Sequence, residues 1–168
     1  MFDDEILMSA GQLVEELINL KLWVTTAESC TGGLIAGALT SVSGASSCVS
    51  AGYVTYSNDA KIDALKVSKA TLDEYGAVSE EVVTEMAFGA QRAASADLAL
   101  AVSGVAGPRG GTPLKPVGLV HIAARGGLTS DHMDIQTLML GDIGRAEVRR
   151  ETVLAALRLG LNVLNTKF

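Results

Sequence analysis

A serine followed by a cysteine lies in a run of small residues, 27–33, between two apolar segments. The preceding segment, residues 22–26, is rich in β-branched residues and predicts a buried strand, and the following one, residues 34–39, predicts a helix. Where a strand turns directly into a helix, backbone N–H groups point at whatever lies above the turn. Ser29 would face these fixed dipoles, which stabilise an anion forming beside it. The turn therefore suits either a nucleophile that cleaves amides or esters or a passive phosphate site.

Other readings of these residues stay open at this point. Ser29 could simply cap the helix that follows it. Cys30 is a rival nucleophile, because a thiol at a helix N-terminus has a lowered pKa, and the residues alone do not decide between the two. Lys61 taken alone is typical of a solvated helix lysine. His121 and His132 lie in or beside expected strands, at no spacing that indicates a catalytic triad or a metal site.

The elements that would position these residues alternate between helix and strand. Asp3 and Asp4 begin the first helix, and Ser79 caps the fifth. Hydrophobic periodicity predicts helices at residues 6–20, 34–43, 60–67, 69–75, 80–95 and 145–164. It predicts strands at residues 22–26, 49–56, 98–102, 117–124 and 133–140, with a hairpin turn at 125–129. This order predicts an α/β protein, a three-layer αβα sandwich with a mixed, partly parallel central sheet.

Polar residues gather where three of the expected strands end. If the first three strands are parallel, right-handed crossovers place their carboxyl ends at one edge of the sheet, where ligands bind in such folds. Those ends carry Ser29, residues 56–58, and Ser103 with Gly104, and Lys61 lies one turn beyond the second. The topology therefore predicts one crevice built from three distant segments. The glycine-rich loop that begins at Ser103 allows close approach of a ligand, although it could equally be a flexible crossover.

Composition narrows the class of protein. The 168 residues suggest a single domain over 1–168, and a net charge of −6 argues against a nucleic-acid surface. No apolar run reaches the roughly 18 residues of a membrane span, and the acidic N-terminus lacks the basic region of a signal peptide. Two cysteines make neither a zinc pattern nor a disulfide framework. We expect a cytoplasmic protein that binds neither membranes nor nucleic acid.

Several sequence blocks together carry a resemblance to a known family. They are residues 27–33, 53–61, 76–79, 103–108 and 115–118. In this order, and over nearly the whole chain, they resemble the CinA C-terminal domain family. The resemblance implies a nicotinamide-nucleotide amidohydrolase, which converts nicotinamide mononucleotide and water to nicotinate mononucleotide and ammonia. It also implies a Ser–Lys hydrolase that needs no metal and no cofactor. The chain resembles the stand-alone form, since the large N-terminal domain of full-length CinA proteins is absent.

The resemblance also implies roles for individual residues. Ser29 would be the nucleophile and Lys61 its general base, with Tyr56 assisting by hydrogen bonding within the pair. A lysine of ordinary pKa, about 10.4, is an ammonium ion at pH 7, so the role requires a crevice that lowers the pKa by desolvation. Backbone N–H groups of residues 30–33 could hold the oxyanion. We assign to substrate binding Cys30, Thr31, Gly32, Gly33, Asn58, Ser103, Gly104, Ala106, Gly107 and Arg145.

The start of the last helix departs from the family pattern. Many members have an arginine directly after a Gly-Asp pair, whereas residues 143–144 separate that pair from Arg145 here. Arg145 is therefore either a phosphate ligand or part of an exposed basic patch with Arg149 and Arg150.

Two further function classes compete with the amidohydrolase. One is a non-catalytic nucleotide-binding or competence-damage-associated interaction module, and the other is an amidase for another small amide. Release of ammonia from nicotinamide mononucleotide separates the first hypothesis from both. The family also suggests a homodimer, for which the apolar first helix could serve as an interface.

Overall fold

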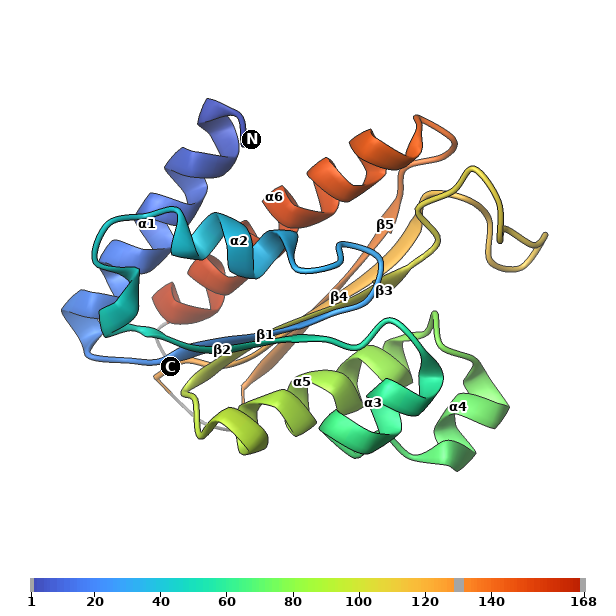
Figure 1. Cartoon of the computed structure of the whole chain (residues 1–168), viewed down its shortest axis with the longest axis horizontal. Helices are drawn as coiled ribbons and strands as arrows, with labels where there is room; N and C mark the ends of the chain where they lie inside the picture. Colours follow the sequence, from blue (N-terminus) through green and yellow to red (C-terminus); the bar gives the residue numbers. More distant parts are fainter. Residues whose placement is uncertain (1, 129–131, 167–168) are drawn as a thin grey trace.

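Five strands form one mixed sheet in the order β2-β1-β3-β4-β5, as Figure 1 shows. The computed structural model describes residues 2–128 and 132–166. The strands are β1 Val24–Glu28, β2 Val49–Val54, β3 Leu98–Gly104, β4 Leu119–Gly126 and β5 Met133–Met139. β1 pairs in parallel with both β2 and β3, and β4 and β5 continue the sheet antiparallel. The predicted parallel arrangement of the first three strands is confirmed.

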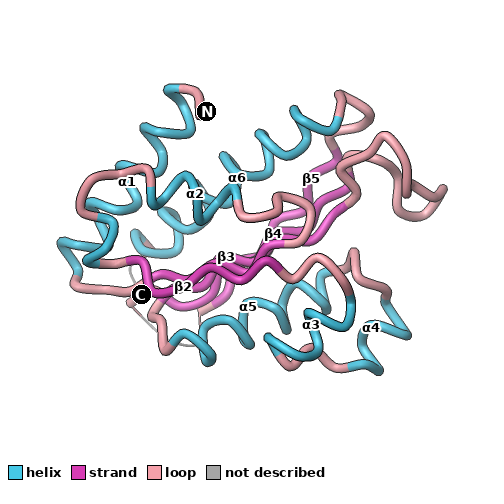
Figure 2. The backbone as a smooth tube through the Cα atoms, in the orientation of Figure 1, coloured by secondary structure: helices cyan, strands magenta, loops and turns pink. Residues whose placement is uncertain are grey.

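Helices cover both faces of this sheet. They are α1 Asp4–Leu20, α2 Leu34–Thr40, α3 Asn58–Leu65, α4 Lys69–Tyr75, α5 Glu80–Ala94 and α6 Arg145–Asn165, with a short 3₁₀ turn at Ala45–Ser47. α1, α2 and α6 lie on one face and α3, α4 and α5 on the other (Figures 1 and 2). The three-layer αβα sandwich with a mixed sheet is therefore confirmed.

The apolar side of α1 packs inside the chain. The Asp3 side chain accepts a hydrogen bond from the Ile6 backbone N–H (3.0 Å) and so begins the helix, as the sequence predicts. Leu13 and Leu17 are completely buried in the core that α1 shares with α6. Leu7, Met8 and Ile18 of the same helix are exposed, so the suggestion that α1 could serve as a dimer interface stays a prediction.

A close approach of two helices sets the position of α3. Gly89 of α5 lies so near α3 that a Cβ atom there would be 1.9 Å from the carbonyl oxygen of Leu65. Any larger residue would push the helices apart. Leu65 and Met86 are buried between them in the core on this side of the sheet. This contact fixes α3, which carries Lys61, against the rest of the molecule.

Some predicted boundaries shift for identifiable reasons. The first strand begins at Val24 rather than residue 22, because the Leu22 N–H donates to the Leu17 carbonyl at the end of α1 (2.9 Å). It extends to Glu28, which the sequence placed in the turn. β4 continues through Gly126, and residue 129 of the predicted hairpin turn lies outside the described residues. None of the helices in the described ranges has the length and hydropathy to cross a membrane.

Candidate active site

Ser29 and Lys61 meet at the edge of the sheet where β1 and β2 end. The Lys61 Nζ lies 3.2 Å from the Ser29 Oγ and donates to the Thr55 carbonyl at 2.8 Å. Ser29 directly follows β1, and its N–H donates to the Val102 carbonyl of neighbouring β3. The Ser57 side chain accepts from the Ala60 N–H and so begins α3. This helix places Lys61 one turn past β2. The predicted meeting of these segments is therefore present.

The environment of the Lys61 amine favours its neutral form. Lys61 is 1% exposed, and desolvation lowers its pKa below the ordinary value of 10.5. Within the described residues its amine makes no ion pair with a carboxylate, which would oppose that shift. A neutral amine can donate to the Thr55 carbonyl and accept the Ser29 hydroxyl proton. The geometry therefore suits a general base acting on Ser29.

Cys30 has the opposite electrostatics from those of a reactive thiol. Its side chain is 5% exposed and belongs to the core on the α6 side of the sheet. Burial raises its pKa to about 11, and the nearby Glu28 carboxylate adds to the increase. The expectation that the helix N-terminus lowers this pKa is wrong, because desolvation outweighs the dipole. Between the two rival nucleophiles, the structure favours Ser29.

The N-terminus of α2 is occupied by a side chain of the chain itself. The buried Glu28 carboxylate accepts from the N–H groups of Gly33, Ile35 and Ala36 at 2.8–3.0 Å. The Gly32 N–H donates to the Ser29 carbonyl. Two of the four N–H groups expected to hold an oxyanion are therefore already bonded, which leaves those of Cys30 and Thr31.

Glycine is required at two positions of this turn. Gly32 and Gly33 have φ angles of +62° and +96°, in the left-handed region that glycine adopts at little cost. Thr31 is fully buried, and its hydroxyl donates to Glu28 at 2.7 Å. These three residues shape the backbone around Ser29 rather than offering side chains to a ligand.

Tyr56 has a different partner from the one expected. Its hydroxyl accepts a hydrogen bond from the Arg145 guanidinium (3.0 Å), and 61% of the residue is exposed. In the described residues it makes no hydrogen bond to Ser29 or Lys61. Arg145 also donates to the Gly107 carbonyl (3.1 Å), so α6 is joined to the loop after β3. Two predicted binding residues, Arg145 and Gly107, are thus bonded to each other, and Arg145 is also bonded to Tyr56.

The residues at the end of β3 serve mainly packing. The Ser103 hydroxyl is buried and donates to the Ala77 carbonyl at 2.6 Å. A Cβ at Gly104 would lie 2.7 Å from the Leu119 carbonyl oxygen, so this glycine admits strand β4 rather than a ligand. Ala106 is buried in the core. The assignment of Ser103, Gly104 and Ala106 to substrate binding therefore stays a prediction that these packing contacts do not support.

Arg149 lies beside the Ser29 turn and was not assigned to substrate binding from the sequence. Its guanidinium donates to the Thr31 carbonyl at 2.8 Å, four residues along α6 from Arg145. The i,i+4 spacing, which puts both arginines on one face of a helix, was the available signal. Arg150 instead pairs with Asp3 and Glu5 and is therefore engaged elsewhere. Asn58, the first residue of α3, is exposed.

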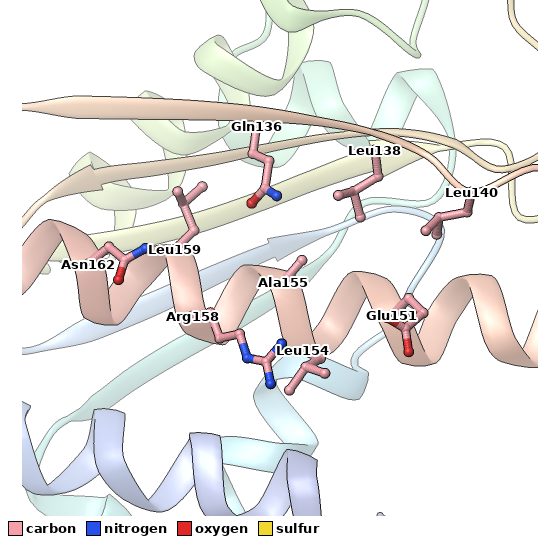
Figure 3. Close-up of a pocket in the computed structure, with 9 residues that line it drawn as sticks. All are labelled: Gln136, Leu138, Leu140, Glu151, Leu154, Ala155, Arg158, Leu159 and Asn162. Carbon is pink, nitrogen blue, oxygen red and sulfur yellow. The ribbon is translucent and has the colours of Figure 1, made fainter.

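A hollow in the surface lies in a different region from Ser29 and Lys61. A hollow of about 340 Å³ opens between β5 and α6 (Figure 3). Its lining residues are Gln136, Leu138, Leu140, Glu151, Leu154, Ala155, Arg158, Leu159 and Asn162. None of them belongs to the turn after β1 or to α3. Only the chemistry of the side chains singles out the Ser29 edge.

The fold and the site together define a class. The chain is an αβα sandwich whose parallel strands end at a serine paired with a buried lysine. Residues 7–164 match the CinA C-terminal domain, and the chain belongs to that family.

Relatives of this chain cover it almost completely. It is 50% identical over 164 residues to the nicotinamide-nucleotide amidohydrolase PncC of Pseudomonas putida, covering 98% of this chain and 99% of that protein. It is 49% identical over 146 residues to a putative competence-damage inducible protein of Thermoanaerobacter sp. strain X514. That match covers 86% of this chain but 34% of the relative, so the chain spans about a third of that longer protein.

A solved structure shares the whole fold. The competence/damage inducible protein CihA of Agrobacterium tumefaciens superposes with a TM-score of 0.94 at 46% identity, with 99% of each chain covered. The similarity therefore extends over all elements that position Ser29 and Lys61.

Proposed function

We propose that this protein is a nicotinamide-nucleotide amidohydrolase that converts nicotinamide mononucleotide and water to nicotinate mononucleotide and ammonia. The observation that carries the proposal is the 3.2 Å approach of a buried Lys61 amine to the Ser29 hydroxyl. The PncC relative from Pseudomonas putida, which bears that activity in its name, supports the choice of substrate.

In the first half-reaction Ser29 becomes acylated. Neutral Lys61 accepts the hydroxyl proton while Oγ attacks the carboxamide carbon. The backbone N–H groups of Cys30 and Thr31 stabilise the oxyanion of the tetrahedral intermediate. Lys61 returns its proton to the amide nitrogen, the C–N bond breaks, and ammonia leaves. The positively charged pyridinium ring of the substrate withdraws electrons and makes the carbon more electrophilic.

In the second half-reaction water releases the product. Lys61, neutral again, accepts a proton from water as the oxygen attacks the acyl carbon. The bond to Oγ then breaks, Lys61 returns the proton to Ser29, and nicotinate mononucleotide departs. One amine thus serves both steps because each begins with the same neutral form.

Two arginines supply positive charge for the phosphate of the substrate. Arg145 and Arg149 are bonded to carbonyl or hydroxyl oxygens and, in the described part of the chain, to no carboxylate. A guanidinium group that is not paired with a carboxylate can bind a phosphate through two parallel N–H donors. Arg145 and Tyr56 form the outer rim, and Arg149 lies beside the Ser29 turn.

Ammonia release from purified protein tests this proposal. With nicotinamide mononucleotide as substrate we expect equimolar ammonia and nicotinate mononucleotide, whether or not a chelator is present. Binding of the nucleotide without any ammonia would favour a non-catalytic module instead. Ammonia from other small amides but not from this nucleotide would favour a different amidase.

We also propose that the protein forms a homodimer, as the family resemblance implies. Light scattering after gel filtration tests this, and a mass of one chain would contradict it.

A further inference from the structure

Glu28 is a buried acid that the proposed reaction does not use. It ends β1, immediately before Ser29, and is completely buried. Such a carboxylate is costly unless it is hydrogen-bonded or paired with a cation. No ion pair to Glu28 is present within the described ranges, so its negative charge is balanced by hydrogen bonds alone.

Five donors converge on this carboxylate. Oε2 accepts from the Thr31 hydroxyl (2.7 Å) and from the N–H groups of Gly33 and Ile35 (3.0 Å each). Oε1 accepts from the Ala36 N–H (2.8 Å) and the Thr26 hydroxyl (3.2 Å). The N–H groups at the start of α2 also carry the positive end of the helix dipole. The acid is thus fully bonded without a basic side chain.

These bonds link the chain on both sides of the nucleophile. Thr26 precedes Ser29 in β1, and the other four donors follow it in the turn and in α2. The backbone of Glu28 is held as well, since its carbonyl accepts from the Thr55 N–H of the segment that follows β2 (2.9 Å). The turn that contains Ser29 is therefore fixed at both ends by one residue.

The same bonds determine which N–H groups remain for a ligand. Glu28 takes the Gly33, Ile35 and Ala36 donors, and the Ser29 carbonyl takes Gly32. The N–H groups of Cys30 and Thr31, in the described part of the chain, donate to no protein oxygen. The Thr31 carbonyl is in turn held by Arg149. The Cys30 and Thr31 N–H groups thus lie on a short segment that the bonds to Glu28 hold from both sides, and the Cys30 N–H also faces its own sulfur.

We infer that Glu28 is a positioning residue, which aligns the Cys30 and Thr31 N–H groups with the oxyanion that forms at Ser29. The inference rests on the proposed function, because it assigns Glu28 a part in that reaction. Glu28 acts through the backbone and touches neither the substrate nor Lys61.

Replacement of Glu28 by glutamine removes acceptors at almost constant volume. The amide nitrogen cannot accept, so either the donors now on Oε1 or those now on Oε2 lose their partner. We expect Glu28→Gln to lower kcat about 10- to 100-fold, since a small displacement of positioned groups has effects of this size. KM and the pH midpoint of the rate should stay unchanged, because neither the arginines nor Lys61 is altered.

Glu85 provides a matched control for the loss of a capping carboxylate. Its Oε2 accepts from the Ser68 N–H and its Oε1 from the Thr71 hydroxyl, both at 2.6 Å, at the start of α4. Glu85→Gln makes the same chemical change away from Ser29 and should leave kcat within about twofold. Thr31 provides a milder test: Thr31→Val removes one bond to Glu28 and should lower kcat, whereas Thr31→Ser keeps the hydroxyl and should restore it.

Sulfonylation of Ser29 by phenylmethylsulfonyl fluoride, followed by mass spectrometry, gives a readout that needs no substrate. We expect Glu28→Gln and Thr31→Val to slow it and Glu85→Gln to leave it unchanged. Glu28→Gln that only lowers the melting temperature, with wild-type kcat and labelling rate, would overturn the inference. If Glu28→Gln does not fold, a Thr31→Val variant with wild-type kcat and a wild-type rate of Ser29 labelling would overturn the inference.

The labelling also separates this inference from the proposed function. Slowed labelling in Glu28→Gln together with no ammonia from the wild type would leave the positioning role standing and reject the amidohydrolase. Ammonia release by the wild type, with wild-type kcat and labelling rates in Glu28→Gln and Thr31→Val, would support the amidohydrolase and reject the positioning role. A Ser29 that resists the reagent in a wild type that releases no ammonia would reject both.

Discussion

Two neighbouring parallel strands, β1 and β3, each carry a serine at or just past the same edge of the sheet. Ser29 follows β1 and faces a buried amine, whereas Ser103 near the end of β3 donates its hydroxyl to the Ala77 carbonyl. The strands are in register, with Glu28 opposite Val102, and each serine is the next residue along its own strand direction. The partner of each hydroxyl, rather than its position in the fold, therefore decides which serine can react.

The two ends also differ in how they use glycine. After β1, Gly32 and Gly33 adopt left-handed conformations that turn the chain sharply around Ser29. In β3, Gly104 instead makes room for the backbone of β4. A run of small residues at a strand end is thus compatible with either a reactive turn or close packing.

The largest expected effect separates Ser29 from its neighbour Cys30. Ser29→Ala should lower kcat for ammonia release by at least about 10³-fold, because the nucleophile of the acyl-enzyme is lost. Cys30→Ala keeps the backbone N–H and should retain most activity, since its thiol is buried with a raised pKa. Steady-state kinetics of both variants check this, and the reverse order of activities would make Cys30 the nucleophile.

The arginine anchored to the loop after β3 should act on binding. Arg145→Ala removes a cation bonded to Tyr56 and Gly107, so KM for nicotinamide mononucleotide should rise about tenfold or more, with a smaller change in kcat. Arg158→Ala on the same helix removes a cation that pairs with Glu5 and should leave KM unchanged. Equal KM values for Arg145→Ala and Arg158→Ala would contradict the assignment of Arg145 to phosphate binding.

Lys61 should make the stability of the protein depend on pH. Its pKa is lower in the folded protein than in the unfolded chain, so between the two values the unfolded chain binds more protons and stability rises with pH. The slope from this one group is at most about 1.4 kcal/mol per pH unit. Urea unfolding of the wild type and of Lys61→Met measures it. A slope that persists in Lys61→Met would arise from other groups.

The smallest effect on turnover is expected at the end of β3. Ser103→Ala leaves the Ala77 carbonyl without its donor, which should destabilise the fold by about 1–3 kcal/mol. Turnover of the folded variant should stay within about threefold of the wild type, because Lys61 faces Ser29. A loss of kcat in Ser103→Ala as large as that in Ser29→Ala would contradict the claim that only the serine after β1 takes part in the reaction.

Much of the site could be predicted because it follows from topology. Three parallel strands with right-handed crossovers place their carboxyl ends together, so Ser29 and Lys61 had to lie close once the helix after β2 was assigned. Ser57 and Asp3 are helix caps whose role depends on local sequence alone.

The remaining features depend on contacts between distant segments. Nothing local indicates that Glu28 turns inward to cap α2, because an acid at the end of a strand is usually solvated. The Arg145–Tyr56 contact depends on the path of residues 141–144, which lead from the end of the sheet into α6. The core position of Cys30 likewise depends on α6, which lies more than 100 residues away.

The protonation state of Lys61 is the central claim. An NMR titration of ¹³C-labelled lysine side chains, with Lys61→Met to assign the signal, measures it directly. We predict one lysine that titrates clearly below the other lysines and whose signal is missing from the variant. A Lys61 that titrates together with the exposed lysines would contradict the account, because its amine would then be charged when Ser29 must lose its proton.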